Sequence, residues 1–165
     1  MLTKLVVSAF ALLASMQPLL AATVTGAEIV EYGLFDKVSI GSRKEPAVLT
    51  GQVDEVPMVK LKERTTIIPA ALGTTFGITV KLIGSPSGER VNCWITWLHP
   101  KLTNPETGQA SDRSEFPSRW PIGEVTPTGF TFEHPWELVP GTWTVRVIWD
   151  WKVVAEKTFN VMPPR

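Results

Sequence analysis

Few residues in this sequence could do chemistry. There are two histidines and one cysteine. His99 and His134 are each followed by proline, and neither lies at the spacing of a metal-ligand motif. A zinc site would need both to converge with a carboxylate, such as Glu133 or Asp112. We therefore interpret the two histidines as strand-end residues in turns, and we predict no metal site and no bound cofactor.

Signatures of nucleophilic and phosphate chemistry are also missing. The chain has no Gly-x-Ser-x-Gly elbow, and the glycine-bearing residues 73–77 lack the lysine and the following helix of a phosphate loop. Cys93 alternates in phase with the apolar residues of its segment, which predicts a buried structural thiol. We predict that the protein is not an enzyme. A metal-assisted hydrolase using His99 and His134 is the enzymatic alternative.

The tryptophans are more informative, because all seven follow residue 93. Three of them occupy inward positions of predicted strands: Trp97, Trp143 and Trp149. Trp120, Trp136 and Trp151 fall instead in predicted loops or at a hairpin tip, where exposed aromatic side chains often mark a binding surface. The alternative is that the loops fold back and bury these rings. We predict Trp120, Trp136 and Trp151 as binding residues, with Trp151 the strongest candidate for exposure.

Composition excludes several classes of protein. Sixteen basic and sixteen acidic side chains give no net charge, so the basic surface of a nucleic-acid-binding protein is missing. Hydrophobic residues make up 44% and charged residues 19%, which argues against a disordered chain. A single cysteine cannot form a disulfide within the chain.

The first 22 residues have the pattern of a secretory signal peptide. Lys4 precedes an apolar run over residues 5–13, and small residues follow at Ala21 and Ala22. The run is too short to span a bilayer, and no cysteine follows it that could carry a lipid. We expect cleavage after Ala21 or Ala22, no later membrane insertion, and a periplasmic or secreted single domain over residues 23–165.

Prolines spread along the chain leave no room for long helices, so short strands are expected instead. Residues 75–83 and 89–98 alternate between apolar and polar side chains and flank a turn rich in Gly, Ser and Pro. We expect these two segments to form an antiparallel hairpin. Residues 142–149 and 153–161 predict a second hairpin, in which the inward position of Lys157 leaves the register of the last strand open.

Other segments give weaker patterns. Residues 27–35, 56–68 and 130–133 are strand candidates, and the lysines within 60–64 suit an edge strand. Residues 100–129 show no clear periodicity and predict a long, functional loop. Together these elements predict an all-β protein: an immunoglobulin-like antiparallel β-sandwich of about seven to nine strands, preceded by a cleaved signal peptide. A closed barrel is the alternative.

Three blocks of sequence resemble an uncharacterised family of bacterial secreted proteins, catalogued as a domain of unknown function. They are residues 67–77 (IIPAALGTTFG), 137–143 (ELVPGTW) and 156–161 (EKTFNV). The turn that this family tends to fill with Asp-Gly is Asp150-Trp151 here. The resemblance extends over roughly residues 33–161 and implies a secreted, immunoglobulin-like domain, with no activity and no functional residues attached.

The resulting hypothesis is an exported, non-enzymatic binding module. Its partner would be an unknown protein or envelope component, contacted through the loop over residues 100–129 and through Trp120, Trp136 and Trp151. The protein would be a monomer or a weak oligomer. A structural envelope component that assembles by pairing of an edge strand is a further alternative.

Overall fold

The structure is a computed structural model that describes residues 21–36, 41–55 and 60–163. The predicted signal peptide, residues 1–22, falls almost wholly outside the described residues. The elements are, in order, β1 (Thr23–Asp36), β2 (Gly41–Lys44), β3 (Gln52–Glu55), β4 (Lys60–Glu63), β5 (Ile67–Pro69), β6 (Thr75–Ser85), β7 (Arg90–Thr103), β8 (Ala110–Pro121), β9 (Val125–Thr131), the 3₁₀ turn η1 (Pro135–Glu137), β10 (Gly141–Trp149) and β11 (Lys152–Met162).

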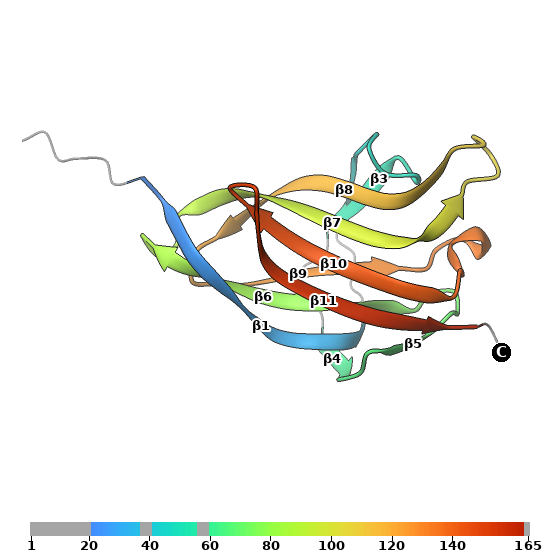
Figure 1. Ribbon diagram of the computed structural model, residues 1–165, viewed down its shortest axis with the longest axis horizontal. Helices are drawn as coiled ribbons and strands as arrows, with labels where there is room; N and C mark the ends of the chain where they lie inside the picture. The colour runs from blue at the N-terminus through green and yellow to red at the C-terminus, as the bar shows by residue number, and fades with distance from the viewer. Residues whose placement is uncertain (1–20, 37–40, 56–59, 164–165) are drawn as a thin grey trace, which may run out of the picture.

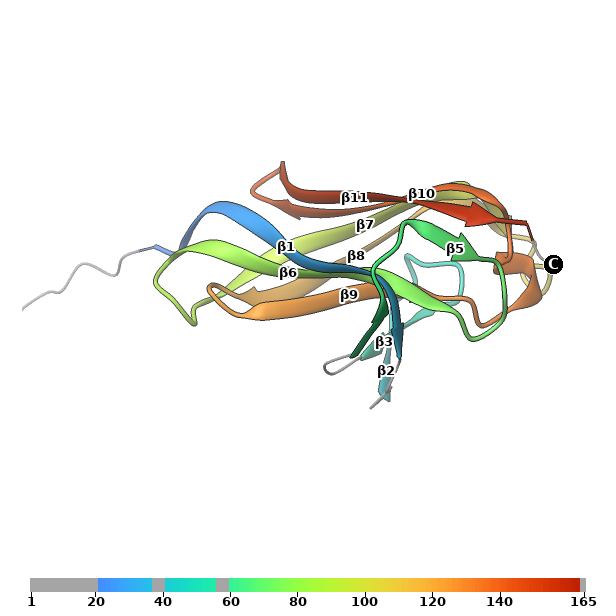
Figure 2. The ribbon, with the colours of Figure 1, turned by 90° about the horizontal axis from the view of Figure 1, so that it is seen from below.

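Nine of these strands form two sheets packed face to face (Figure 1, Figure 2). One sheet has the order β4-β1-β6-β9, and the other has the order β5-β11-β10-β7-β8. All neighbours are antiparallel except β5 and β11, which run parallel. The remaining pair, β2 and β3, makes a short ribbon that projects beside the two sheets (Figure 2). The predicted β-sandwich is confirmed, and the closed barrel is wrong.

Alternating side chains build the core as the sequence predicts. The buried inner residues of β6, β7 and β10 are Phe76, Ile78, Val80, Leu82, Val91, Cys93, Ile95, Trp97, Trp143, Val145 and Val147. Phe76 lies at the centre, with its ring centroid 5.4 Å from those of Trp97 and Phe159. Edge-to-face contacts of this kind add to the free energy of burial, so an aromatic cluster joins the two sheets.

The first predicted hairpin is wrong, because β6 and β7 belong to different sheets. The turn between them carries the chain across the sandwich rather than back along the same sheet. Alternation in a sequence reports which face of a strand is buried, and a strand buries its inner face equally well in either sheet. The pattern that predicted the faces correctly therefore could not choose the partner.

The second predicted hairpin is confirmed. β10 and β11 pair from Gly141 with Val161 to Trp149 with Lys152, and Asp150 and Trp151 turn the chain with φ of 48° and 62°. These left-handed angles are those of a two-residue hairpin turn. The register of β11, which the sequence left open, places Ala155, Phe159 and Val161 on the inner face. The pairing shifts between Val147 and Ile148, and Val153 beyond this shift is exposed.

Lys157 nevertheless keeps its inner-face position on β11. Its Nζ lies 3.5 Å from the centroid of the Tyr32 ring, so the aromatic face receives the cation. The residue that looked misplaced in the sequence therefore joins β11 to β1 of the other sheet.

Residues 100–129 do not form the long loop that the sequence predicted. β7 runs on to Thr103, and β8 and β9 occupy most of the remainder. Both β8 and β9 are edge strands, and they hold Pro117, Pro121 and Pro127. Proline lacks the N–H of a sheet ladder and is tolerated at such edges, so the feature that suggested a loop marks the border of the sheets.

Candidate ligand site at the open edge of the sandwich

The two long edges of the sandwich differ. On one side the chain passes from β4 in the first sheet to β5 in the second within three residues, and the Thr66 carbonyl accepts the Asn160 N–H at 2.7 Å. We call this side the closed edge. On the other side β8 and β9 lie in opposite sheets, and among the described residues β8 pairs only with β7 and β9 only with β6. We call this side the open edge.

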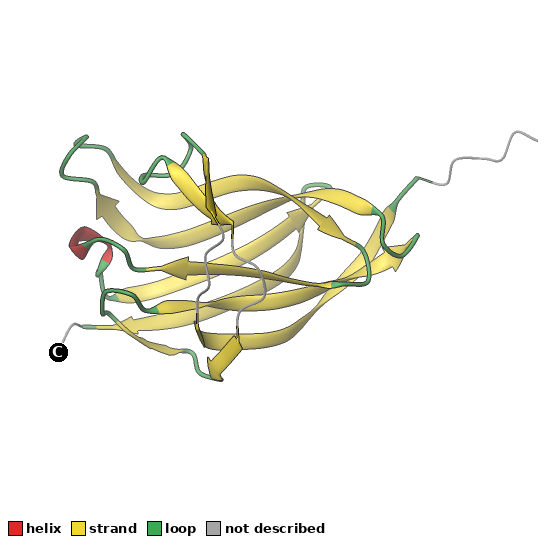
Figure 3. Ribbon diagram, turned by 180° about the vertical axis from the view of Figure 1, so that it is seen from behind, coloured by secondary structure: helices red, strands yellow, loops and turns green. Residues whose placement is uncertain are grey.

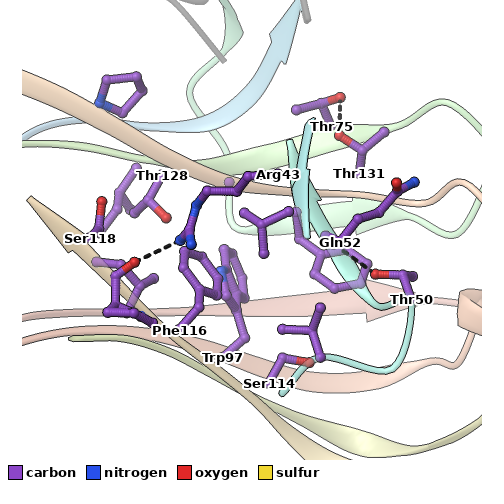
Figure 4. A pocket seen from close by; sticks show the side chains of 18 of the residues that line it. Arg43, Thr50, Gln52, Thr75, Trp97, Ser114, Phe116, Ser118, Thr128 and Thr131 are labelled. Carbon is purple, nitrogen blue, oxygen red and sulfur yellow. Dashed lines mark hydrogen bonds between the residues drawn. The ribbon is translucent and has the colours of Figure 1, made fainter. Parts of the chain in front are cut away.

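A cavity of about 710 Å³ lies at the open edge. This volume falls in the range of pockets that hold small molecules. Its walls come from β7, β8, β9 and the β2–β3 ribbon, and its apolar lining includes Val48, Ile95, Trp97, Phe116, Trp120 and Phe130. Figure 4 shows Trp97 and Phe116 below Arg43 of the ribbon. The lining follows β8 from Ser114 to Trp120, which is about 20 Å at the usual rise per strand residue. The cavity is therefore a trough that runs along the open edge.

Residues 41–55, which we call the strap, include the β2–β3 ribbon that projects from the sheets (Figure 3). The strap contributes Arg43 and residues 48–50 and 52–53 to the lining of the trough. Arg43 Nη2 donates a hydrogen bond of 2.7 Å to the Pro117 carbonyl, and Asn104 Nδ2 donates one of 3.1 Å to the Leu49 carbonyl. The Arg43 guanidinium also lies 5.8 Å from the centroid of the Phe116 ring. An isolated two-stranded ribbon is marginal in water, so these contacts with β7 and β8 hold the strap in place.

Trp97 supplies an unusual donor within the cavity wall. Its side chain is 1% exposed, and its Nε1 has no hydrogen-bond acceptor in the part of the chain that the structure describes. The neighbouring tryptophans differ, because Trp143 Nε1 donates to the Val139 carbonyl and Trp120 Nε1 to Ser118 Oγ. A buried N–H without an acceptor costs about 1–3 kcal/mol. Protein atoms enclose this Nε1, so a ligand in the cavity would not reach it without a rearrangement of the wall.

The two ends of the trough carry opposite charges. Arg90 and Arg119 line one end, and each donates a guanidinium hydrogen bond to the other's backbone carbonyl. Glu133 and Glu137 line the other end. Glu137 is buried and its Oε2 accepts the N–H groups of Glu133 and His134; burial raises the pKa of this carboxyl, and the two N–H groups oppose that rise.

The two histidines occupy different surroundings. His99 is buried on β7, where its Nδ1 lies 2.9 Å from the Pro100 carbonyl and its Nε2 lies 3.1 Å from Ser114 Oγ. A carbonyl only accepts, so neutral His99 carries its proton on Nδ1 and Ser114 donates to Nε2. Burial lowers the pKa of His99. His134 is exposed and stacks on the Trp136 ring at 5.3 Å between centroids.

Neither histidine belongs to a metal-ligand group in this structure. Among residues 21–36, 41–55 and 60–163, no three His, Cys, Asp or Glu side chains gather as a metal site would require. Cys93 is fully buried, and burial raises the pKa of its thiol to about 11. The predicted buried thiol is confirmed.

The three tryptophans predicted to bind do not form one surface. Trp120 is 2% exposed and lies on β8, so its predicted place in a loop is wrong, and the alternative that the ring is buried holds for it. Its ring lines the trough from the inner face of β8. Trp136 is half-buried in η1 and lines the glutamate end of the trough. Trp151 is 92% exposed at the tip of the β10–β11 hairpin, as predicted, and lies outside the trough lining.

Other trough residues were missed. The sequence predicted Trp97 only as an inward core residue and placed Phe116 within the loop over residues 100–129, and it gave no functional prediction for Arg43. The prolines of β8 and β9 were the one available signal, since they mark edge strands. Nothing in the sequence indicated that two such edges face each other across an opening.

With two packed antiparallel sheets, this is an immunoglobulin-like β-sandwich. A crystal structure described as an immunoglobulin-like protein from Pseudomonas aeruginosa is similar to it, with a TM-score of 0.59 and 27% sequence identity, over 82% of this chain and 96% of that chain. Residues 24–161 match the family described as domain of unknown function DUF3859, and the chain belongs to that family. No curated protein matches the chain. No helix in the described residues is long and apolar enough to cross a membrane.

Proposed function

We propose that this domain is an exported, non-enzymatic binding module that holds a small ligand in the trough at its open edge. The observation that carries the proposal is the cavity of about 710 Å³ itself, which is lined by the aromatic side chains of Phe116, Phe130 and Trp136. A concave, largely apolar site of this size is typical of pockets that hold small molecules. Phe116 and Phe130 provide the apolar surface that a ligand would cover.

A binding role fits the chemistry of the site better than catalysis does. His99 is held neutral by burial and is already hydrogen-bonded at both ring nitrogens. Cys93 has a raised pKa, which disfavours the reactive thiolate. The export of the module rests on the signal-peptide pattern of residues 1–22.

Assembly by strand pairing is less well supported at this edge. Pro117 and Pro121 in β8 and Pro127 in β9 each remove a donor that an added strand would need. At the closed edge, β4 presents exposed Lys60 and Lys62, which discourage pairing between sheets. Trough binding is therefore the better supported of the two hypotheses.

Binding of N-phenyl-1-naphthylamine, a neutral apolar dye, tests the proposal through dye emission excited by energy transfer from tryptophan. Thr128→Phe places a ring in the trough and is expected to abolish dye binding, because Thr128 lines the cavity. Val125→Phe is the matched control, since Val125 is exposed on the same strand outside the lining. The proposal fails if the folded wild-type protein binds no dye, or if both variants bind it as the wild type does.

A second candidate function is contact with an envelope protein through the tip of the β10–β11 hairpin. Trp151 there is 92% exposed and has a φ of 62°, a conformation that costs a non-glycine residue about 1–2 kcal/mol. An exposed large ring held in a strained turn suits a contact residue better than a stabilising one.

Trp151→Gly tests this second function. The variant is expected to be more stable than the wild type and to lose a cross-linked partner from the native envelope. Trp94→Thr is the control, because Trp94 is half-exposed on the outer face of β7, away from the turn. Capture that survives Trp151→Gly unchanged would exclude the tip as the contact.

A further inference from the structure

We propose that two copies of this chain associate through the outer face of the sheet β5-β11-β10-β7-β8, with Trp94 near the centre of the contact. The proposal goes beyond ligand binding in the trough and does not depend on it. Three features of this face carry it: an apolar row that crosses four strands, the exposure of that row, and charges of opposite sign on its two sides.

The apolar row runs straight across the sheet, as the strand register shows. Trp94 on β7 pairs with Pro117 on β8 and with Ile148 on β10. Ile148 in turn pairs with Val153 on β11. Paired residues share a face, and Trp94 alternates with the buried Cys93, so the row faces outward. We call these residues the outer row: Trp94, Pro117, Ile148 and Val153.

The outer row is accessible from solvent. Trp94 is 43% exposed and Val153 is 50% exposed, while Pro117 is exposed and Ile148 is half-buried. The β2–β3 ribbon projects away from β10 and β11, so it does not cover this face (Figure 2). Exposed apolar side chains that adjoin one another mark contact surfaces, in contrast to apolar residues scattered singly.

The charges beside the outer row alternate in sign. On β8, Glu115 and Arg119 lie two residues before and two residues after Pro117, so both share its face. At the same spacing, Arg146 and Asp150 flank the row on β10 and in the turn that follows it. β8 and β10 run in the same direction, because both are antiparallel to β7. The acidic residue therefore precedes the row on β8 and follows it on β10.

A two-fold axis along the outer row turns these charges into pairs. The axis places each strand over the same strand of the second copy in the opposite direction, so residues before the row face residues after it. Glu115 then faces Arg119 of the second copy, and Arg146 faces Asp150, each pair occurring twice. Opposite charges that meet in this way set the register of an interface, whereas like charges would oppose it.

The groups of the Glu115–Arg119 pair are open to a second copy. Four residues along one strand separate them by about 13 Å, so they cannot pair within a chain. The Arg119 guanidinium donates to the Arg90 carbonyl at 3.4 Å, and it has no carboxylate within 4.0 Å among the described residues. The hydrogen bonds to Glu115 from Thr96 and Arg113 both end on Oε2, which leaves Oε1 for a further donor.

The size of the face predicts a weak dimer. Four strands over about eight residues give a surface of about 20 Å by about 25 Å, or about 500 Å² on each copy. The total of about 1,000 Å² is at the low end for a specific interface. We therefore expect a dissociation constant of about 10–100 µM.

Sedimentation velocity of the purified protein, from below to above this concentration, tests the dimer. Arg119→Glu places a carboxylate over Glu115 of the second copy, and Glu115→Arg places a guanidinium over its Arg119. Each variant alone should raise the dissociation constant at least about tenfold. An equimolar mixture of the two should form a heterodimer, because every pair at these positions is then of opposite sign. Lys81→Glu reverses an exposed charge on the other sheet and should dimerise as the wild type does.

Trp94→Thr is a second test that leaves the charges in place. Threonine suits a strand, so the variant should fold and sediment as a monomer. It should still bind the dye in the trough, and a partner held through Trp151 should still be captured, so the dimer and the proposed functions can fail separately.

Four results would overturn the dimer. They are a wild type that stays monomeric at every concentration, a dimer that Trp94→Thr leaves unchanged, a dimer that neither charge reversal weakens, and two monomeric charge variants that do not associate when mixed. Retention of a monomeric wild type on a polysaccharide column, lost in Trp94→Thr, would assign the outer row to a glycan instead of a second copy.

Discussion

The closed and open edges of this sandwich terminate the two sheets in different ways. Each must end a pair of sheets without leaving a long, exposed edge strand. At the closed edge the chain crosses between the sheets, and β5 pairs with β11. At the open edge prolines protect β8 and β9, and the strap covers the gap through Arg43 and Asn104. The closed edge also has a cavity, of about 620 Å³, but its lining holds none of the aromatic side chains that line the open edge.

The largest expected difference between the edges is in the free energy of unfolding lost when an aromatic residue is replaced by alanine. Phe159 is fully buried beside the closed edge, so Phe159→Ala should lower the free energy of unfolding by about 3–5 kcal/mol. Phe116 is half-buried in the trough, and Phe116→Ala should cost about 1 kcal/mol, since its ring already borders a cavity. Urea unfolding measures both values. Equal losses would mean that the trough is as tightly packed as the core.

A glycine at the closed edge gives the next largest effect. Gly33 has a φ of 136°, and a Cβ there would collide with the Glu63 carbonyl oxygen of β4. Gly33→Ala should therefore cost about 2–3 kcal/mol, from backbone strain and from separation of β1 and β4. Gly51→Ala in the strap, with a φ of 71° and open space around it, should cost only about 1 kcal/mol. Equal costs, compared by thermal unfolding, would show that close packing does not distinguish the two edges.

A pair of tryptophans sharpens the comparison further. Trp143→Phe leaves the Val139 carbonyl without its donor, whereas Trp97→Phe removes an N–H that already lacks an acceptor. Each substitution replaces an indole ring in the core by a smaller phenyl ring. Without ligand, Trp143→Phe should therefore be the more destabilising by about 1–2 kcal/mol in urea unfolding. A larger loss for Trp97→Phe would indicate that its Nε1 is satisfied in solution.

The smallest expected effect concerns pH. His99 has a lowered pKa in the folded state, so its contribution to stability is present above its ordinary value of 6.5 and is lost as pH falls below that value. Protonation also forces Ser114, a trough residue, to turn from donor to acceptor. The urea midpoint should fall between pH 7.5 and pH 5 more in the wild type than in His99→Gln. His134→Gln, at an exposed position, should behave as the wild type; an identical pH dependence in all three proteins would contradict the role of His99.

Local patterns predicted much of the fold. Alternation identified the inner faces of β6, β7 and β10, and the Asp150-Trp151 turn joined the correct pair of strands. Alternation did not predict which strands pair when the partners are distant in the sequence. β6 and β7 flank a plausible hairpin turn, yet each finds its neighbours elsewhere in the chain, because burial of one face does not specify which sheet a strand joins.

The candidate site was predicted only in fragments. Trp120 and Trp136 were predicted as binding residues and both line the trough, although Trp120 lies in a strand and not in the predicted loop. The trough brings together Arg43, Phe116 and Trp97, which are distant in the sequence. The residues that flank each of them in the sequence do not indicate that they converge. Trp143 and Trp120 find acceptors within four residues along the chain, at Val139 and Ser118, whereas Trp97 has none among the described residues, and the sequence does not indicate this difference.

The sequence by itself determined the β-sheet character, the buried faces of the main strands, the exposure of Trp151 and the small number of side chains suited to catalysis. These properties follow from residue types and from a period of two, which act over a few neighbouring residues. The tertiary structure alone decided that β6 and β7 separate, that β8 and β9 face each other across a trough, and that the Trp97 donor is left unpaired there. Those outcomes depend on contacts between segments far apart in the chain, and no local preference encodes them.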